Sequence, residues 1–204
     1  MIALTSPYLW YATRSTGLVA MVLLTTVVAL GSLVAMRAGG TFIGRFEINE
    51  IHRSLSMVAM TFVVLHVATT VADSYVSTGP ISIVIPLTSA YKRLGVGIGA
   101  VAFDLLIAVW VSSLLKLRIK NQSWRFIHWF SWMAIAATLL HALQTGTDAH
   151  RGAGRYAIFA CAAVVVVAAL ARFFFRPTRA GGRTALSPLR GDVESHPDKR
   201  ERRR

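Results

Sequence analysis

The sequence has little charge and almost no cysteine. Only 15% of its 204 residues are charged, and nine of them are Asp or Glu. Its single cysteine, Cys161, excludes an intramolecular disulfide and any site built on paired cysteines, such as CxxC or CxxCH. No general acid–base or nucleophilic constellation is evident either. The chain therefore lacks the usual features of a soluble hydrolase or of a disulfide-stapled secreted domain.

Apolar residues, by contrast, make up 54% of the chain. A run of about 20 apolar residues can cross a bilayer as a helix. Five such runs are present: Leu9–Met36, Ile51–Ala72, Leu94–Leu117, Trp124–Gln144 and Gly154–Phe175. The first is longer than the apolar core of a signal peptide, so we expect it to be retained. The sequence predicts an all-α, polytopic membrane helix bundle with five transmembrane helices, spanning residues 1–175 without a soluble catalytic domain.

The positive charges predict how this bundle is oriented. The chain has 22 Lys and Arg residues and a net charge of +13. With five spans, 17 of the 22 fall on one side and five on the other. Because positive residues accumulate on the cytoplasmic side, we expect the N-terminus outside and the C-terminus in the cytoplasm, in the plasma (cytoplasmic) membrane. Residues 176–204 are predicted to be a basic, disordered cytoplasmic tail that favours anionic lipid over nucleic acid.

Four histidines lie in two of the apolar runs, as the doublets His52/His66 and His128/His141. Ionisable side chains are costly in hydrocarbon and usually face a partner inside the bundle. The second and fourth spans cross in the same direction, so we expect His52 to meet His128 and His66 to meet His141. The doublet spacings of 14 and 13 residues correspond to rises of about 21 and 20 Å.

The two doublets differ in whether their histidines would face the same side of a regular helix. At about 100° per residue, 14 residues return to within about 40° of the starting direction, whereas 13 miss it by about 140°. We therefore expect a bulge, a kink or a different ligand approach in the fourth span. Two imidazole pairs at two depths suit two haems, because haem iron accepts axial histidines. The second ring nitrogen would donate to a backbone carbonyl or to one of several hydroxyls: Ser56, Thr69, Thr70, Ser131 and Thr138.

Other interpretations of the histidines remain open. Non-haem metal sites normally bring three or four ligands together, and the doublets are too far apart along the helices to converge. The four imidazoles could also be structural. A different class of protein, a histidine-based metal or proton transporter without haem, is the alternative function.

The doublets, H-x13-H and H-x12-H with one span between them, resemble the ferric reductase-like transmembrane domain family. This family includes ferric reductases, NADPH oxidases and MsrQ, the haem subunit of a methionine-sulfoxide reductase system. The stretches NEIHRSLSM, WRFIHW and LLHALQTGTD are similar as well, and the resemblance covers roughly Leu9–Phe175. It implies a dihaem b-type cytochrome, with an inner haem on His52 and His128 and an outer haem on His66 and His141.

The resemblance also implies electron transfer from a cytoplasmic flavin to an outer-face acceptor, such as ferric iron, oxygen or a redox protein. The chain departs from the family in having five spans rather than six, and no FAD or NAD(P)H module follows them. The glycines Gly95, Gly97 and Gly99 favour close helix or macrocycle packing over a dinucleotide site.

We therefore expect an oxidoreductase subunit that needs a partner. That partner would be a cytoplasmic flavoprotein supplying FMN or FAD chemistry, or a quinol. The alternative within the same class is a quinol-linked cytochrome b subunit of a larger oxidoreductase.

Several further residues are candidates for haem contacts. Haem propionates favour cationic or tyrosine partners near the membrane surface. The candidates are Arg53 and Arg125 on the inner side, and Arg14, Lys92, Arg93 and Tyr91 on the outer side, with interfacial anchoring as the alternative for each. Trp124 and Trp129 are predicted to be interface anchors, and Phe62 and Phe103 to line the haems. Asp104 is predicted to be a hydrogen-bonding brace. The linker 73–93 is expected to lie in the interface or to cap the outer haem.

Overall fold

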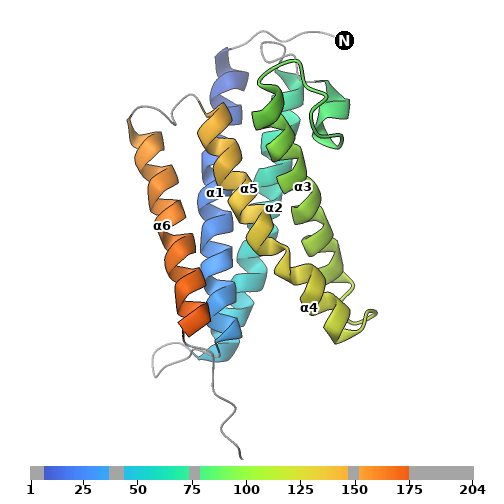
Figure 1. Cartoon of the computed structure of the whole chain (residues 1–204), viewed down its shortest axis with the longest axis vertical. Coiled ribbons are helices and arrows are strands. Elements are labelled where there is room, and N and C mark those ends of the chain that lie inside the picture. The colour runs from blue at the N-terminus through green and yellow to red at the C-terminus, as the bar shows by residue number, and fades with distance from the viewer. Residues whose placement is uncertain (1–6, 37–43, 74–78, 147–151, 175–204) are drawn as a thin grey trace, which may run out of the picture.

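The computed structural model describes residues 7–36, 44–73, 79–146 and 152–174, and this part of the chain contains helices and no strands. The predicted tail and His150 lie outside the described residues. The elements in chain order are α1 (Pro7–Ala35), α2 (Arg45–Ala72), the short η1 (Pro80–Ile83), α3 (Arg93–Leu114), α4 (Asn121–Trp129), α5 (Ser131–Thr145) and α6 (Ala153–Phe174). Figure 1 shows them as a bundle of roughly aligned helices.

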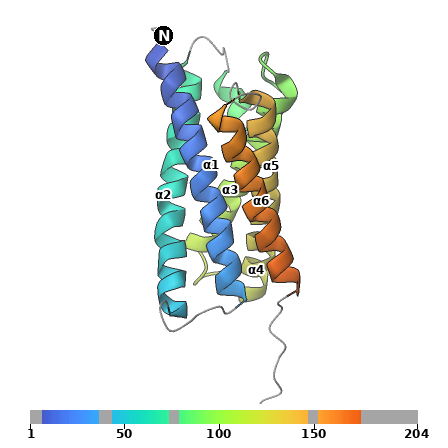
Figure 2. The same cartoon turned by 90° about the vertical axis from the view of Figure 1, so that its left-hand side faces the viewer.

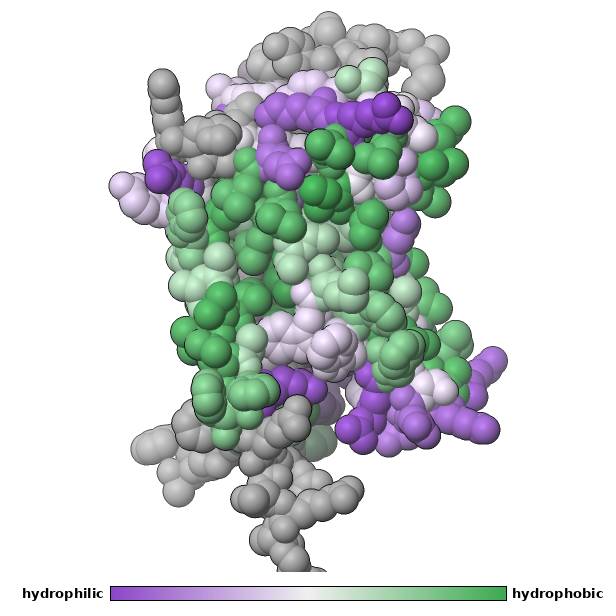
Figure 3. Space-filling model, in the orientation of Figure 1, coloured by the Kyte–Doolittle hydropathy of each residue, from purple (hydrophilic) through white to green (hydrophobic). Residues whose placement is uncertain are grey.

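The prediction of five membrane-length helices is confirmed for the described residues. α1, α2, α3, the α4–α5 pair and α6 are each long and apolar enough to cross a membrane. α2 begins at Arg45, six residues before the predicted apolar run, which did not include its polar first turns. Glu47 lies in the first turn, where the helix dipole favours a negative charge. A hydrophobic surface covers the middle of the face shown in Figure 3, with hydrophilic residues at both ends.

α1 is the central helix of the bundle. It packs along most of α2 and also contacts α6 and α5, as Figures 1 and 2 show from two sides. α3 packs along α5 and α4. α2 makes at most a few close backbone approaches to α3, α4 or α5. The histidine-bearing helices are therefore held by α1 and α3, with a gap between them.

Small and aliphatic side chains fill the core around α1. One buried cluster joins α1 to α2 and α5, and a second joins α1 to α5 and α6. Ala59 and Ala134 are fully buried, and Met21 and Ile135 are almost so. Alanine at these positions lets helix axes approach closely, as is typical of membrane bundles.

The fourth span is interrupted at Phe130, between α4 and α5. The Phe130 N–H bonds to the carbonyl of Ile127, three residues back, at 3.0 Å, instead of the carbonyl four back that a regular α-helix uses. Of the bulge, kink or different ligand approach expected from the shorter spacing of the second doublet, the structure has a break in the helix. It lies immediately after His128.

The segment around η1 folds back over the N-terminal end of α3. Leu87 has a left-handed backbone (φ 69°), and its carbonyl accepts a 2.6 Å hydrogen bond from Nε of Arg93. A Cβ on Gly97 would lie 2.9 Å from Leu87, so glycine is needed for this contact. Ile81, Val84 and Ile85 stay exposed and apolar, which agrees with the prediction of an interfacial segment.

We call the end of the bundle that carries η1 the upper end, as drawn in Figure 1, and the opposite end the lower end. The described basic residues near the lower end are Arg45, Arg53, Lys116, Arg118, Lys120, Arg125 and Arg172. Those near the upper end are Arg14, Lys92, Arg93 and Arg155. This distribution follows the positive-inside pattern, and which end faces the cytoplasm stays a prediction.

Candidate functional site: two histidine pairs

The four histidines form the two pairs that the sequence predicts. The ring centroids of His66 and His141, the upper pair, are 6.3 Å apart, and the ring planes cross at 75°. The centroids of His52 and His128, the lower pair, are 6.4 Å apart, with an angle of 67°. Two pairs of nearly equal geometry therefore lie at two depths of the bundle, about 21 Å apart along α2.

Three of the four imidazoles are held by backbone carbonyls. Nδ1 of His66 lies 2.9 Å from the carbonyl oxygen of Thr13, and Nδ1 of His52 lies 3.0 Å from that of Val27. Nδ1 of His141 lies 2.8 Å from the carbonyl oxygen of Gly95. Because a carbonyl can only accept, Nδ1 must carry the proton in the neutral ring, and Nε2 keeps its lone pair.

The hydroxyl of Thr145 lies near Nε2 of His141 but does not use the lone pair of this nitrogen. Oγ1 of Thr145 lies 3.4 Å from Nε2, but it donates its proton to the backbone carbonyl of His141 at 2.7 Å. The hydroxyl has only one proton, so the lone pair of Nε2 remains available to a ligand.

A repeat on α1 creates the places where the α2 histidines sit. Thr13 and Val27, whose carbonyls accept the hydrogen bonds, have the same spacing along α1 as His52 and His66 have along α2. Gly17 and Gly31 lie one turn after these carbonyls. A Cβ on Gly17 would be 2.9 Å from Nδ1 of His66, and one on Gly31 would be 3.1 Å from Cε1 of His52. The missing side chains let each imidazole reach the backbone.

α3 carries the same arrangement for the upper pair and a variant of it for the lower pair. Gly99 follows the Gly95 carbonyl by one turn, and a Cβ on it would lie 2.5 Å from Nδ1 of His141. Val109 and Ser113 occupy the corresponding places at the lower pair. Oγ of Ser113 donates to the carbonyl of Val109 at 2.8 Å and lies 3.4 Å from Nδ1 of His128. The fourth imidazole therefore meets a hydroxyl instead of a carbonyl.

The sequence patterns indicated the backbone as a possible acceptor but favoured no specific residue. The hydroxyls of Ser56, Thr69, Thr70 and Thr138 all donate to carbonyls of their own helices. Ser113 was not among the candidates. The equal spacings of Gly17/Gly31 and His52/His66 are the signal in the sequence that could have identified the α1 acceptors.

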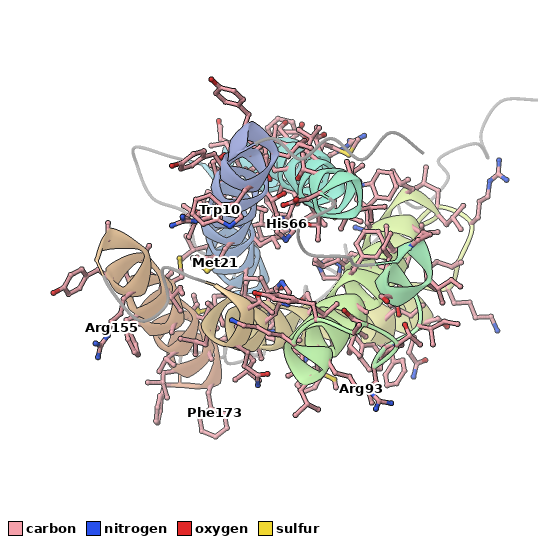
Figure 4. All side chains as sticks on the ribbon, turned by 90° about the horizontal axis from the view of Figure 1, so that it is seen from above. Trp10, Met21, His66, Arg93, Arg155 and Phe173 are labelled. Atoms are coloured by element: carbon pink, nitrogen blue, oxygen red, sulfur yellow. The ribbon has the colours of Figure 1, made fainter. Side chains whose placement is uncertain are left out.

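A cavity of about 270 Å³ surrounds the upper pair. A single water molecule needs only about 10–15 Å³ by such a measure, so the space suits a much larger group. Its wall is mainly apolar and includes Phe103, as predicted. Besides the two histidines, the polar residues on it are Trp10, Thr13, Arg14, Thr70, Asp73, Ser82, Tyr91, Thr138 and Thr145. In Figure 4, His66 points inward, whereas Arg155 and Phe173 point outward from α6.

An aromatic side chain holds the lower pair. The indole of Trp124 stacks on the imidazole of His128, with centroids 4.9 Å apart and an angle of 27°. Nζ of Lys116 lies 4.2 Å from the centre of the Trp124 ring. Trp124 is therefore a neighbour of His128, a contact that the sequence analysis did not predict. Trp129, in contrast, is 61% exposed, as an anchor would be.

Two buried polar atoms beside the pairs have no hydrogen-bond partner among the described residues. They are Nε1 of Trp124, next to the lower pair, and Oγ1 of Thr13, in the wall of the upper cavity. Leaving a buried donor unpaired costs about 1–3 kcal/mol. Both atoms are where a bound group with acceptor oxygens could satisfy them.

The predicted cationic residues differ in their placement. Arg14 lines the upper cavity, with its guanidinium 4.1 Å from the centre of the Trp10 ring. Arg53 and Arg125 are exposed. Lys92 instead binds the C-terminal end of α5, because its Nζ donates to the carbonyl of Gln144 at 3.1 Å.

The acidic residues do not join the histidines. Asp104, on α3, is exposed and forms no hydrogen bond or ion pair with another described residue, so the predicted brace is not present there. No group of three or more His, Cys, Asp or Glu side chains converges among the described residues. Each site therefore offers two protein nitrogens.

These features define a class: an all-helical protein with five membrane-length helices and two matched histidine pairs. Residues 8–148 match the model of a domain family of unknown function, DUF8596, and the chain belongs to this family. The matched segment contains α1 to α5 and hence both histidine pairs and the helices that hold them. No curated protein and no solved structure matches the chain.

Proposed function

We propose that the chain is a dihaem b-type membrane protein that transfers electrons across the bilayer. The lower haem would be held by His52 and His128, and the upper haem by His66 and His141. The observation that carries the proposal is the repeated pair geometry, 6.3 and 6.4 Å between ring centroids. Two imidazoles on opposite sides of one metal ion have centroids about 6 Å apart, because each metal–nitrogen bond is about 2.0 Å.

The surroundings of the pairs support haem rather than simple imidazole packing. Direct edge-to-face packing also allows such a centroid distance, but it needs no cavity and leaves no polar atoms unpaired. Here the upper pair lines a cavity of about 270 Å³, and the buried Trp124 and Thr13 atoms have no partner. Haem carboxylates, which accept hydrogen bonds, could use both, with Arg14 as a cationic partner at the upper site.

Haem would supply one-electron iron chemistry at each pair. The chain itself orients the imidazoles: the carbonyls of Thr13, Val27 and Gly95 fix Nδ1 as the protonated nitrogen. This leaves Nε2 as the ligand atom and increases its basicity. The wall of the upper site is mainly apolar, and α1 and α3 pack against the two ligand helices.

The electron donor and acceptor would meet opposite ends of the bundle. With the orientation predicted from the positive charges, a cytoplasmic flavoprotein or a quinol delivers electrons to the lower pair. An acceptor at the outer face takes them from the upper pair. Reduction of the purified protein by a quinol alone would favour the quinol-linked cytochrome b alternative over a flavin-fed, ferric reductase-like chain.

The test is haem content and absorbance after expression in cells well supplied with haem. The wild type should show the Soret and α bands of low-spin b haem and two haems per chain. His66→Ala and His141→Ala should each remove one haem, and His52→Ala and His128→Ala the other. His196→Ala, which removes a histidine outside the apolar runs, is the control. Wild-type protein without haem would overturn the proposal and favour the transporter or a structural role.

A further inference from the structure

The imidazoles are held by a repeated pattern on α1 and α3, a carbonyl followed one turn later by a glycine, and Ser113 is the exception to it. Gly17, Gly31 and Gly99 each lie one turn after the carbonyl that binds a histidine Nδ1. The fourth glycine of the pattern would follow Gly99 at the same spacing that separates Gly17 from Gly31, and Ser113 occupies this position. His128 is the one imidazole of the four that has a side-chain oxygen beside Nδ1 in place of a carbonyl.

The carbonyl that His128 would use is already occupied. Val109 stands where Gly95 stands in the upper site, and its oxygen accepts hydrogen bonds from Oγ of Ser112 and Oγ of Ser113, both at 2.8 Å. Oγ of Ser113 therefore lies near both this carbonyl and Nδ1 of His128, where the upper site has only the hydrogen atom of Gly99. Nδ1 of His128 is left with Ser113 Oγ at 3.4 Å, which is long for a hydrogen bond.

The interruption at Phe130 explains why a side chain fits at position 113. A side chain at position 99 would collide with His141, whose Nδ1 is 2.5 Å from the added Cβ. His128 lies on α4 and His141 on α5, so the break at Phe130 separates them. His52 and His66, in contrast, lie on one unbroken helix, α2. At this place Oγ of Ser113 lies 3.4 Å from Nδ1 of His128. Trp124 then steadies the imidazole by stacking on its face.

We propose that Ser113 is a positioning residue that connects Nδ1 of His128 to the Val109 carbonyl through its hydroxyl and weakens the hold on this imidazole. His128 would then be the least basic of the four ligands, because a strong acceptor at Nδ1 increases ligand basicity. The redox consequence of this weaker hold rests on the proposed function. Hydrogen bonds to the ligands of a haem tune its midpoint potential, and a less basic ligand raises that potential. The lower site would therefore have the higher midpoint potential.

The redox test uses opposite changes at one position. Ser113→Gly opens the Val109 carbonyl to His128 and should lower the midpoint potential of the lower haem. Ser113→Ala keeps Cβ but removes the hydroxyl, and should raise the potential and loosen the haem. Each variant is titrated in a His66→Ala background, where only the lower pair remains. At a fixed ambient potential we expect the ferrous-to-ferric ratio to change by up to about tenfold, which corresponds to a shift of about 59 mV in the midpoint potential.

Ser112→Gly and Ser112→Ala are the matched controls. They remove the other hydroxyl from the same carbonyl, and Ser112 makes no contact with His128 among the hydrogen bonds of the described residues. Both should leave the potential near that of the parent. Equal shifts from the Ser112 and Ser113 variants would overturn the positioning role, as would Ser113→Gly and Ser113→Ala moving the potential in the same direction.

A second measurement does not need haem. In apoprotein with 15N-labelled histidine, the Nδ1–H proton of His128 should move downfield in Ser113→Gly, because it gains a stronger acceptor, and should not move in Ser112→Gly. If the wild type binds no haem, the proposed function fails while this measurement still decides the role of Ser113. Unchanged His128 signals in Ser113→Gly would overturn the inference, even in a protein that binds both haems.

Discussion

The upper and lower histidine pairs have the same separation but are held by different means. At the upper pair, both imidazoles donate to backbone carbonyls, inside a cavity closed by the segment around η1. At the lower pair, His52 uses a carbonyl, whereas His128 meets a hydroxyl and stacks on Trp124 next to a break in the helix. Ring separations of 6.3 and 6.4 Å show that the helix backbones, rather than a common set of partners, determine the spacing.

This comparison also distinguishes the rigid site from the adaptable one. A Cβ would press on the imidazole wherever the ring reaches the backbone, most closely at Gly99 (2.5 Å) and Gly17 (2.9 Å) and less closely at Gly31 (3.1 Å). The lower site differs at one position, where Ser113 replaces the glycine beside the break between α4 and α5. We therefore expect the upper site to tolerate fewer substitutions on its supporting helices.

The largest difference should come from Gly99→Ser, which gives the upper site the serine of the lower one. The added Cβ would lie 2.5 Å from Nδ1 of His141, so the imidazole must leave its place. We expect loss of the upper haem and a cost in stability of about 1–3 kcal/mol from overpacking. Haem content and thermal unfolding measure both.

Gly79→Ser is the control, since nothing lies within 4 Å of a Cβ at that position. Retention of both haems in Gly99→Ser would contradict the view that close approach to α3 positions His141.

A smaller difference is expected between Gly17→Ala and Gly31→Ala, which add the same methyl group to the two α1 sites. The Cβ at position 17 would be 2.9 Å from two atoms of the His66 ring, against 3.1 Å from one atom of His52 at position 31. Gly17→Ala should therefore weaken upper-haem retention more than Gly31→Ala weakens the lower. Haem dissociation rates to an excess of apomyoglobin provide the comparison; equal rates in the two variants would mean that α1 supports both sites alike.

The smallest effect on haem content should come from Trp124→Phe, which keeps an aromatic ring beside His128 and removes the buried Nε1–H. Without haem, the N–H has no partner, so its removal should stabilise the apoprotein by about 1–3 kcal/mol. With haem bound, the loss of a hydrogen bond to a carboxylate should cancel or reverse that gain. Thermal unfolding of both forms gives the sign, and stabilisation to the same extent in each would show that Nε1 does not contact the haem.

The sequence was sufficient for the elements and the pairing. Membrane-length helices follow from apolar runs alone, because the length needed to cross a bilayer is fixed. The partners of His52 and His66 follow once spans two and four are taken as parallel. The expectation of a bulge, a kink or a different ligand approach in the fourth span follows from the spacing of the second doublet, which does not return to the same face of a regular helix.

Only the tertiary structure decided how the imidazoles are held. The acceptors for three of them are main-chain carbonyls, which every residue has, so no side-chain pattern marks Thr13, Val27 or Gly95 as partners. The place of Trp124 depends on the direction that α4 takes after the break at Phe130. Apolar periodicity determines which segments cross a membrane, but contacts between helices depend on register and rotation, and these are fixed only when the helices pack together.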